Sequence, residues 1–312
     1  AESNDGRAGN MMGCFVHDIP WDQWVHELDE MEKVTKAQVV QFAKEHYGNN
    51  YAVCYKRLGE ANVHKVEKPQ ITPVVMNKDD VSAFKASWDQ MPQPSITPRF
   101  LDFNKDIVHL KMDKGGIPVD YIYNDVNQTF SLSYIFDMGT DNIRELGLAI
   151  NYLEYLGTDK YTAEQLKMEF YKLGLSFEVN SGRDRVYVTL SGLEENLEKG
   201  IQLFEHVLAS VKPDKEVYDA MVMDILQSRI NAKKNKNAIL YNGLVNYAKY
   251  GKRNPYNNVM SEAELRATNV DNLVSVIKSL TSYKHKIFYY GQRDTKNLLS
   301  TLNTLHKSRD TY

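Results

Sequence analysis

The chain has 312 residues, a length that predicts about two domains. Hydrophobic residues make up 42% of the sequence and charged residues 25%, which is the composition of an ordinary soluble globular protein. The net charge of −3 gives no case for the basic surface that binds nucleic acid. No apolar run approaches the roughly 18 residues that a membrane-spanning helix needs. We therefore expect neither a nucleic-acid partner nor a membrane span.

The cysteine content and the first residues give limited information about location. Cys14 and Cys54 are the only cysteines, so they form neither a disulfide framework nor a Cys-x-x-Cys metal site. We expect free thiols, which do not define the compartment. The sequence begins at Ala1 with no initiator methionine and no signal peptide. We expect a fragment of a longer protein, whose targeting signal would lie upstream.

Residues 1–59 are predicted to be the C-terminal part of a domain. Apolar side chains recur at helical spacing in residues 10–16 and again between Trp21 and Met31. Thr35 is the expected N-cap of the next helix. Residues 51–55, Tyr-Ala-Val-Cys-Tyr, are typical of a β-strand. A late helix followed by a strand, with no earlier partners, indicates a truncated domain.

Residues 60–98 are predicted to be a linker between domains. Proline fixes the backbone angle φ and interrupts regular structure, so a proline-rich segment favours a connection of mixed stiffness. One short helix is expected at residues 81–88. The segment holds five of the nine prolines of the chain: Pro69, Pro73, Pro92, Pro94 and Pro98.

Residues 99–308 are predicted to form a complete α+β domain. Early strands, a helical middle and one late strand favour an antiparallel sheet with helices packed on one face. Lys114-Gly115-Gly116 is the expected hairpin turn, and Asp141 or Asn142 is the expected cap of the first helix. The predicted strands are residues 107–112, 117–123, 130–136, 176–180, 185–190 and 286–291. The predicted helices are residues 143–156, 163–172, 194–210, 215–233, 238–250, 270–280 and 296–306.

The most informative segment is residues 151–155, Asn-Tyr-Leu-Glu-Tyr, on the first predicted helix of this domain. It has the spacing of the inverted zinc motif His-x-x-Glu-His, in which two imidazoles bind the metal and the glutamate handles the proton. Asn151 and Tyr155 stand at the two histidine positions, and Glu154 is retained. Positions i, i+3 and i+4 share one helical face, which is the geometry such a site needs.

The side-chain chemistry of this segment argues against a bound metal. A carboxamide is a weak zinc ligand compared with imidazole, and a phenol stays protonated near neutral pH. The usual zinc ligands are Cys, His, Asp and Glu. We therefore expect no metal at Asn151 and Tyr155. The simpler interpretation of Glu154 is a solvated or salt-bridged residue on an amphipathic helix.

Several segments of residues 99–308, taken in order, resemble the pitrilysin/insulinase family of zinc metallopeptidases. Residues 113–119 resemble the hairpin that opens domains of this family, and residues 136–141 resemble the strand end and glycine turn that follow. Residues 147–158 resemble its histidine-motif helix with the trailing Gly-Thr. Residues 173–177 and 181–185 resemble its next strand pair.

The resemblance implies that this chain lacks all three zinc ligands. In the family the third ligand is a glutamate on a later helix. The corresponding helix here, near residues 217–229, offers Asp224 and Gln227 and no glutamate after Glu216. This pattern resembles the non-catalytic half of such proteins, which shapes the chamber and grips the peptide. Residues 1–59 would then end the catalytic half, and residues 99–308 would begin the inactive one.

The resemblance therefore implies a fragment of a zinc-dependent metalloendopeptidase. Zinc would be bound in the intact protein and not by this chain, so the chain alone is expected to be inactive. The expected partners are a peptide substrate and the catalytic half, in the same protein or in a partner subunit. Strand 185–190 is a possible sheet edge on which a peptide could add a strand, with Arg185, Tyr187 and Thr189 as candidate substrate-binding residues.

Two alternatives belong to other functional classes. The chain could be a non-enzymatic assembly or interaction module that keeps the peptidase fold, or a separate substrate-binding protein. An intact His-x-x-Glu-His several hundred residues upstream would favour the peptidase over the assembly module. The habit of the family suggests a periplasmic or cell-envelope location.

Overall fold

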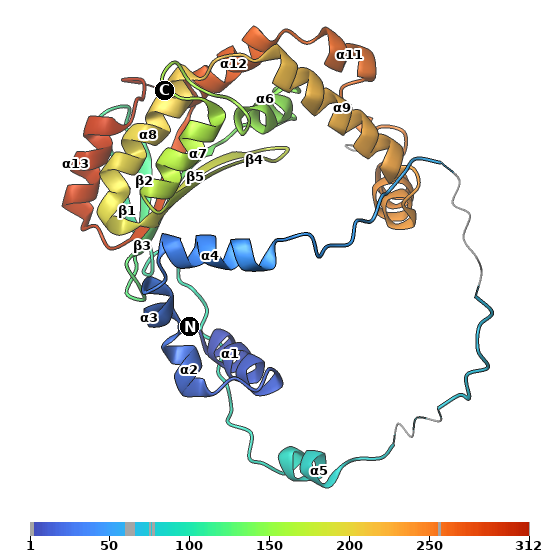
Figure 1. Cartoon of the computed structure of the whole chain (residues 1–312). Helices are drawn as coiled ribbons and strands as arrows, with labels where there is room; N and C mark the ends of the chain where they lie inside the picture. Colours follow the sequence, from blue (N-terminus) through green and yellow to red (C-terminus); the bar gives the residue numbers. More distant parts are fainter. Residues whose placement is uncertain (1–2, 60–65, 75, 77–78, 255–256, 312) are drawn as a thin grey trace. The chain divides into compact units, whose positions relative to one another are not determined.

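The computed structural model describes residues 3–59, 66–74, 76, 79–254 and 257–311 (Figure 1). The chain divides into two compact units, Ala1–Pro98 and Arg99–Tyr312. The three-part division expected from the sequence stays a prediction. Residues 60–65, 75 and 77–78 of the predicted linker lie outside the described residues.

The regular secondary structure described in the first unit consists of helices. Its helices are α1 (Asn4–Val16), α2 (Trp21–Val25), α3 (Glu27–Glu32), α4 (Lys36–His46) and α5 (Ala83–Asp89). The predicted cap of α4 is confirmed: the Thr35 hydroxyl accepts a hydrogen bond from the Gln38 amide, and the Gln38 side chain accepts one from the Thr35 amide. This reciprocal pair satisfies two amides that the first helical turn leaves without partners.

The strand predicted at residues 51–55 is wrong. These residues belong to no strand, and Tyr51 and Tyr55 are each 74% exposed. Alternating apolar residues provide only one face of a strand, whereas a ladder also needs a second strand to receive its hydrogen bonds. The described residues of the first unit contain no strand.

The second unit is built on a six-stranded sheet in the order β1-β2-β6-β3-β5-β4. The strands are β1 (Val108–Lys111), β2 (Pro118–Tyr123), β3 (Thr129–Phe136), β4 (Leu175–Ser181), β5 (Val186–Leu193) and β6 (His285–Gly291). The β1–β2 turn has the predicted glycines, with φ of 70° at Gly115 and 59° at Gly116. Two consecutive left-handed residues match the twist of a tight hairpin, and glycine adopts them without strain.

The sheet is mostly antiparallel, as the sequence predicts, with two differences. β2 pairs in parallel with β6, although every other neighbouring pair is antiparallel. β5 lies between β3 and β4, so the expectation that residues 185–190 form a sheet edge is wrong. Period-2 alternation of side chains identifies a strand but carries no information about its neighbours.

Helices cover one face of this sheet, and α7, α8 and α13 lie across it in Figure 1. Along β3 the residues facing the helices are buried, whereas Ser131, Ser133 and Ile135 on the other face are partly exposed. The α-helices are α6 (Leu146–Leu153), α7 (Ala163–Lys172), α8 (Leu197–Ser210), α9 (Lys215–Ala232), α10 (Asn246–Tyr250), α11 (Glu262–Ala267), α12 (Val270–Ser279) and α13 (Thr295–Leu305). Short 3-10 turns span Glu194–Asn196 and Leu280–Ser282, and a π-helical segment, η2, spans Ala238–Val245.

Helix α6 is shorter than predicted at both ends. Its N-cap is Glu145, without a side-chain cap, so the prediction of Asp141 or Asn142 as the cap is wrong. The Asn142 side chain instead accepts a hydrogen bond from the Gly139 amide at 3.0 Å, which stabilises a separate turn before the helix. At the other end Glu154 is the C-cap residue.

Candidate functional site

A groove of about 1420 Å³ runs along α9, with the end of α6 and the η2–α10 segment on its sides. Much of its lining is apolar, and several of the apolar side chains that line it are exposed to solvent. Leu244 is 61% exposed, Tyr247 56% and Ile239 47%. Soluble proteins rarely expose large apolar surfaces, and those that they do expose commonly mark binding sites.

The positions singled out in the sequence meet in this groove. Asn151, Glu154 and Tyr155 come from the end of α6, and Asp224 comes from the facing side of α9. Because Glu154 is the helix cap and Tyr155 follows it, the predicted spacing is kept although the helix ends one turn earlier. Arg229 and Lys233 add positive charge farther along α9, opposite in sign to Glu154 and Asp224.

Tyr152, inside the same motif, fixes α6 against α9. Its ring is fully buried, and its hydroxyl donates to the Asp214 carbonyl and accepts from the Asp214 amide, both at 2.6 Å. Asp214 is itself the N-cap of α9, with its side chain accepting from Val217. Burial raises the pKa of the Tyr152 phenol, so it stays a neutral donor. Sequence reasoning missed this anchor, although an aromatic residue between the two motif positions marks the buried side of the helix.

The residues of the groove do not fit a zinc ion. Only Glu154 and Asp224 among the four motif positions carry an ordinary zinc-binding group, and a structural or catalytic site needs three or four protein ligands. Across residues 3–59, 66–74, 76, 79–254 and 257–311, no group of three or more His, Cys, Asp or Glu is placed to hold a metal. We therefore assign no metal chemistry to these residues.

We expect the purified chain, equilibrated with zinc and then desalted, to retain about 0.1 zinc per chain or less, because Asn151 and Tyr155 cannot replace imidazoles. Elemental analysis measures this ratio. The Glu154→Gln variant should give the same value. Stoichiometric zinc that is lost on substitution of Glu154 or Asp224 would contradict this interpretation of the groove.

The three candidate substrate-binding residues lie elsewhere, at or along β5. The Thr189 hydroxyl bonds that of Ser133 on the neighbouring strand at 2.8 Å, and Tyr187 is 38% exposed. A hydrogen bond with Tyr187 raises the pKa of the Arg185 guanidinium. None of the three is among the described residues that line the groove. Their role in binding a substrate stays a prediction, without the sheet edge that motivated it.

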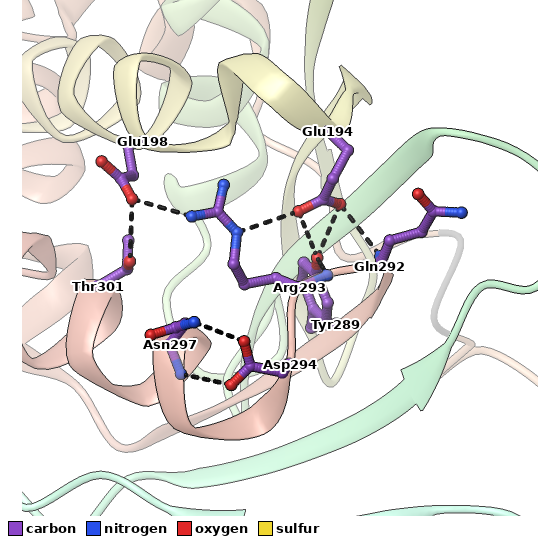
Figure 2. Close-up of polar contacts among 8 residues, drawn as sticks. All are labelled: Glu194, Glu198, Tyr289, Gln292, Arg293, Asp294, Asn297 and Thr301. Carbon is purple, nitrogen blue, oxygen red and sulfur yellow. Dashed lines mark hydrogen bonds and ion pairs between the residues drawn. The ribbon is translucent and has the colours of Figure 1, made fainter.

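A second polar cluster, at the end of β6, is structural (Figure 2). The Glu194 carboxylate accepts from the Tyr289 hydroxyl at 2.7 and 2.9 Å and from the Gln292 amide at 3.2 Å. Arg293 bridges Glu194 and Glu198, at 3.4 and 2.9 Å. Burial and the bond to Glu194 raise the pKa of Tyr289 well above its usual value. Both oxygens of Glu194 already have protein partners, so we do not assign it to a reaction.

No helix among the described residues is long and apolar enough to cross a membrane. No protein-family model matches the chain, and no curated protein is similar to it in sequence. Solved structures do match its fold. A peptidase M16 inactive domain from Pseudomonas fluorescens has a TM-score of 0.55 at 14% identity, over 66% of this chain and 52% of that one.

Two larger proteases match more of this chain. The ferredoxin protease FusC, solved with Arabidopsis ferredoxin, has a TM-score of 0.56 at 12% identity, over 98% of this chain and 36% of that one. The periplasmic protease PqqL from Escherichia coli has a TM-score of 0.56 at 13% identity, over 91% and 30%. The chain thus spans about half the length of the first structure and about a third of the other two. The expected α+β architecture and family resemblance are confirmed at the level of fold: this chain has the fold of the pitrilysin-family peptidases.

Proposed function

We propose that this chain is part of the non-catalytic half of a zinc-dependent peptidase of the pitrilysin type, and that the groove along α9 binds peptide. The observation that carries the proposal is the meeting of the altered motif with an apolar groove. Asn151, Glu154, Tyr155 and Asp224, the positions that the family resemblance matches to zinc-binding residues, line one groove, and only two of them carry an ordinary zinc-binding group.

The lining of the groove suits an extended peptide. Ligand sites are concave and mostly apolar, with a few polar groups that fix orientation. Here Ile239, Leu244 and Tyr247 offer apolar surface, and charged groups of both signs lie on α6 and α9. A peptide or unfolded polypeptide presents apolar side chains and polar backbone together, so it can use both kinds of surface.

The proposed function places catalysis outside these residues. A second half, in the same protein or in a partner subunit, would hold zinc and carry out hydrolysis. This domain would close one side of the chamber and hold the substrate. A periplasmic or cell-envelope location fits this proposal, since PqqL is described as periplasmic, and it is tested by fractionation of the native host.

A pair of leucines on η2 tests peptide binding. Leu244 lines the groove and is 61% exposed, whereas Leu240 lies one turn earlier, is 44% exposed and is not among the described lining residues. We expect Leu244→Ser to weaken the binding of a fluorescent unfolded polypeptide by about tenfold, because one apolar contact of about 1–2 kcal/mol is lost. Fluorescence anisotropy measures the affinity.

Leu240→Ser is the matched control and should bind as the unsubstituted chain does. Equal losses in both variants would show that binding does not use the groove. If the polypeptide does not bind at all while the chain co-purifies with other proteins in a stable complex, the assembly-module alternative is favoured. Hydrolysis by this chain alone, abolished in Glu154→Gln, would contradict the non-catalytic assignment.

A further inference from the structure

Four titratable side chains from four different elements meet in the core of the second unit. Tyr134 lies on β3, Glu205 on α8, His285 on β6, and His306 directly follows α13. Each is buried, with 0 to 3% of the residue exposed. We call these four residues the histidine latch. Buried groups of this kind are costly unless they are fully hydrogen-bonded, so their proton positions are strongly constrained.

The hydrogen bonds of the latch run in one line. The Tyr134 hydroxyl donates to Glu205 Oε1 at 2.9 Å, and His306 Nδ1 lies 2.6 Å from the same oxygen. His306 Nε2 lies 2.9 Å from His285 Nε2. His285 Nδ1 lies 2.7 Å from the Tyr283 carbonyl oxygen, which ends the line.

The Tyr283 carbonyl oxygen and the Glu205 carboxylate, the acceptors at the two ends, determine which ring nitrogens of His285 and His306 carry protons. A carbonyl oxygen has no proton, so His285 Nδ1 must donate to Tyr283, which leaves Nε2 of a neutral His285 as an acceptor. His306 Nε2 must then donate to His285. His306 Nδ1 faces a carboxylate, so a proton lies between His306 and Glu205. This proton belongs either to an imidazolium paired with a carboxylate or to a carboxylic acid.

The contacts of Glu205 favour the charged form. Besides Tyr134 and His306, the Lys307 amide points at Glu205 Oε2 from 3.2 Å. A carboxylate that accepts several hydrogen bonds is stabilised in its ionised state. His306 is then an imidazolium that donates from both ring nitrogens. The two facing histidines and Glu205 do not indicate a metal, since among the described residues no group of three or more His, Cys, Asp or Glu is placed to hold one.

We propose that the histidine latch is an acid-sensitive contact, in which a neutral His285 accepts a hydrogen bond from a cationic His306. Through His306 the latch holds the end of α13 to Glu205 of α8 and to His285 of the sheet. A proton added to His285 removes its lone pair, so the bond to His306 is lost and two positive charges face each other. The latch opens at its His285–His306 contact, and the residues after Leu305 lose their attachment to β6.

The surroundings of the latch agree with this direction. Burial lowers the pKa of His285 to about 4, and the positive charge of His306 adds to the effect. Glu205 and His306 are among the residues that line a hollow of about 510 Å³. Lys114, His206, Lys307 and Arg309 line the same hollow. Glu205 and the hydrogen bond to the Tyr283 carbonyl act in the opposite direction on the pKa of His285, and burial outweighs them.

The sign of the pH dependence follows from this lowered pKa. In the unfolded chain His285 takes up a proton near pH 6.5, whereas in the folded chain it does so only near pH 4. The unfolded state therefore binds more protons between these values. The stability from this residue is fully present above about pH 6.5 and is lost as the pH falls toward 4.

The proton positions are tested by long-range ¹H–¹⁵N NMR of the histidine rings at pH 7. We expect His306 to carry protons on both ring nitrogens and His285 to be the neutral Nδ1–H tautomer. A His306 with a single ring proton, or a His285 protonated at Nε2, would overturn the proposal. So would ring-nitrogen shifts of both residues that move on addition of zinc.

The acid response is tested by urea unfolding of the unsubstituted chain and of His285→Gln. Glutamine keeps an acceptor near the Nε2 position but does not titrate. We expect the ratio of the two unfolding constants to change by up to tenfold per pH unit between about pH 6.5 and 4. His109→Gln, at a histidine with a 57% exposed side chain, should leave that pH dependence in place. Parallel curves for His285→Gln and the unsubstituted chain would overturn the proposal, and a His285→Gln variant that does not fold leaves the NMR measurement to decide.

Discussion

Gly192→Ala is expected to destabilise the second unit by roughly 3–5 kcal/mol, through backbone strain and overpacking together. Gly192 has a φ of 144°, which side-chain-bearing residues rarely adopt. A Cβ at this position would lie 2.2 Å from the Gly174 carbonyl oxygen and 2.9 Å from Leu175 Cα. Gly174 directly precedes β4 and Leu175 is its first residue, paired with Gly192 of β5, so neither backbone atom can move without opening the sheet. Urea unfolding followed by circular dichroism measures the loss.

Gly243→Ala is the matched control. Gly243 lies in η2, has no atom within 4 Å of the added Cβ and does not have a left-handed φ. We expect Gly243→Ala to raise the free energy of unfolding by no more than about 1 kcal/mol, because alanine favours helix over glycine. Equal losses in the two variants would show that the cost comes from glycine replacement in general and not from the close approach at β4–β5.

Glu194→Ala should cost roughly 2–4 kcal/mol, since it leaves the fully buried Tyr289 hydroxyl without its acceptor and removes one carboxylate from Arg293. The cluster in Figure 2 joins the start of α8 to the end of β6, so the loss should appear as a lower unfolding midpoint of the whole second unit. A truncation that costs less than about 1 kcal/mol would show that solvent replaces the bonds of Glu194.

Two variants separate the charge of Glu194 from its hydrogen bonds. Glu195→Ala changes the same residue type one position later, where the side chain is exposed, and should be nearly neutral. Glu194→Gln keeps an acceptor for Tyr289 but loses the charge facing Arg293, so we expect an intermediate cost. If Glu194→Gln is as damaging as Glu194→Ala, the ion pair and not the tyrosine bond carries the effect.

The sequence predicted best those elements whose signals are local. Helix α7 begins and ends at the predicted residues 163 and 172, and Thr162 and Gln165 form a capping box that fixes its start. The sequence contains the same kind of signal at α11, which is not among the predicted helices: Ser261 and Glu264 form a capping box before a helix of only six residues. Capping chemistry is contained in four consecutive residues, so it can be read without a structure.

Features that depend on residues far apart in the sequence could not be predicted from local sequence patterns. The parallel pairing of β2 with β6 joins residues such as Val119 and Ile287, and no local pattern encodes that separation. The interior position of β5 and the absence of a partner for residues 51–55 have the same origin. Strand periodicity describes the faces of a strand, whereas its neighbours are set by the tertiary packing.

The candidate site was predictable in part. Helical spacing and the family resemblance put Asn151, Glu154 and Tyr155 on one face and pointed to Asp224 on the facing helix, and these positions do share a groove. The other side of the groove was not predictable. Residues 238–250 gave the pattern of one regular helix, but they form a π-helical segment and then α10, so the direction of Leu244 and Tyr247 could not be derived from a 3.6-residue repeat.

The place of β6 sets the order in which the sheet can be assembled during synthesis. β6 lies between β2 and β3, although it is the last strand in the chain. A nascent chain that ends before His285 can form only two separate pieces, the β1–β2 hairpin and the antiparallel β3–β5–β4 group. More than a hundred and fifty residues separate β2 from the strand that joins these pieces, so closure of the sheet waits for the C-terminal part of the domain and leaves two open edges until then. A chain truncated just before β6 should therefore associate through its open strand edges rather than fold as a smaller stable domain.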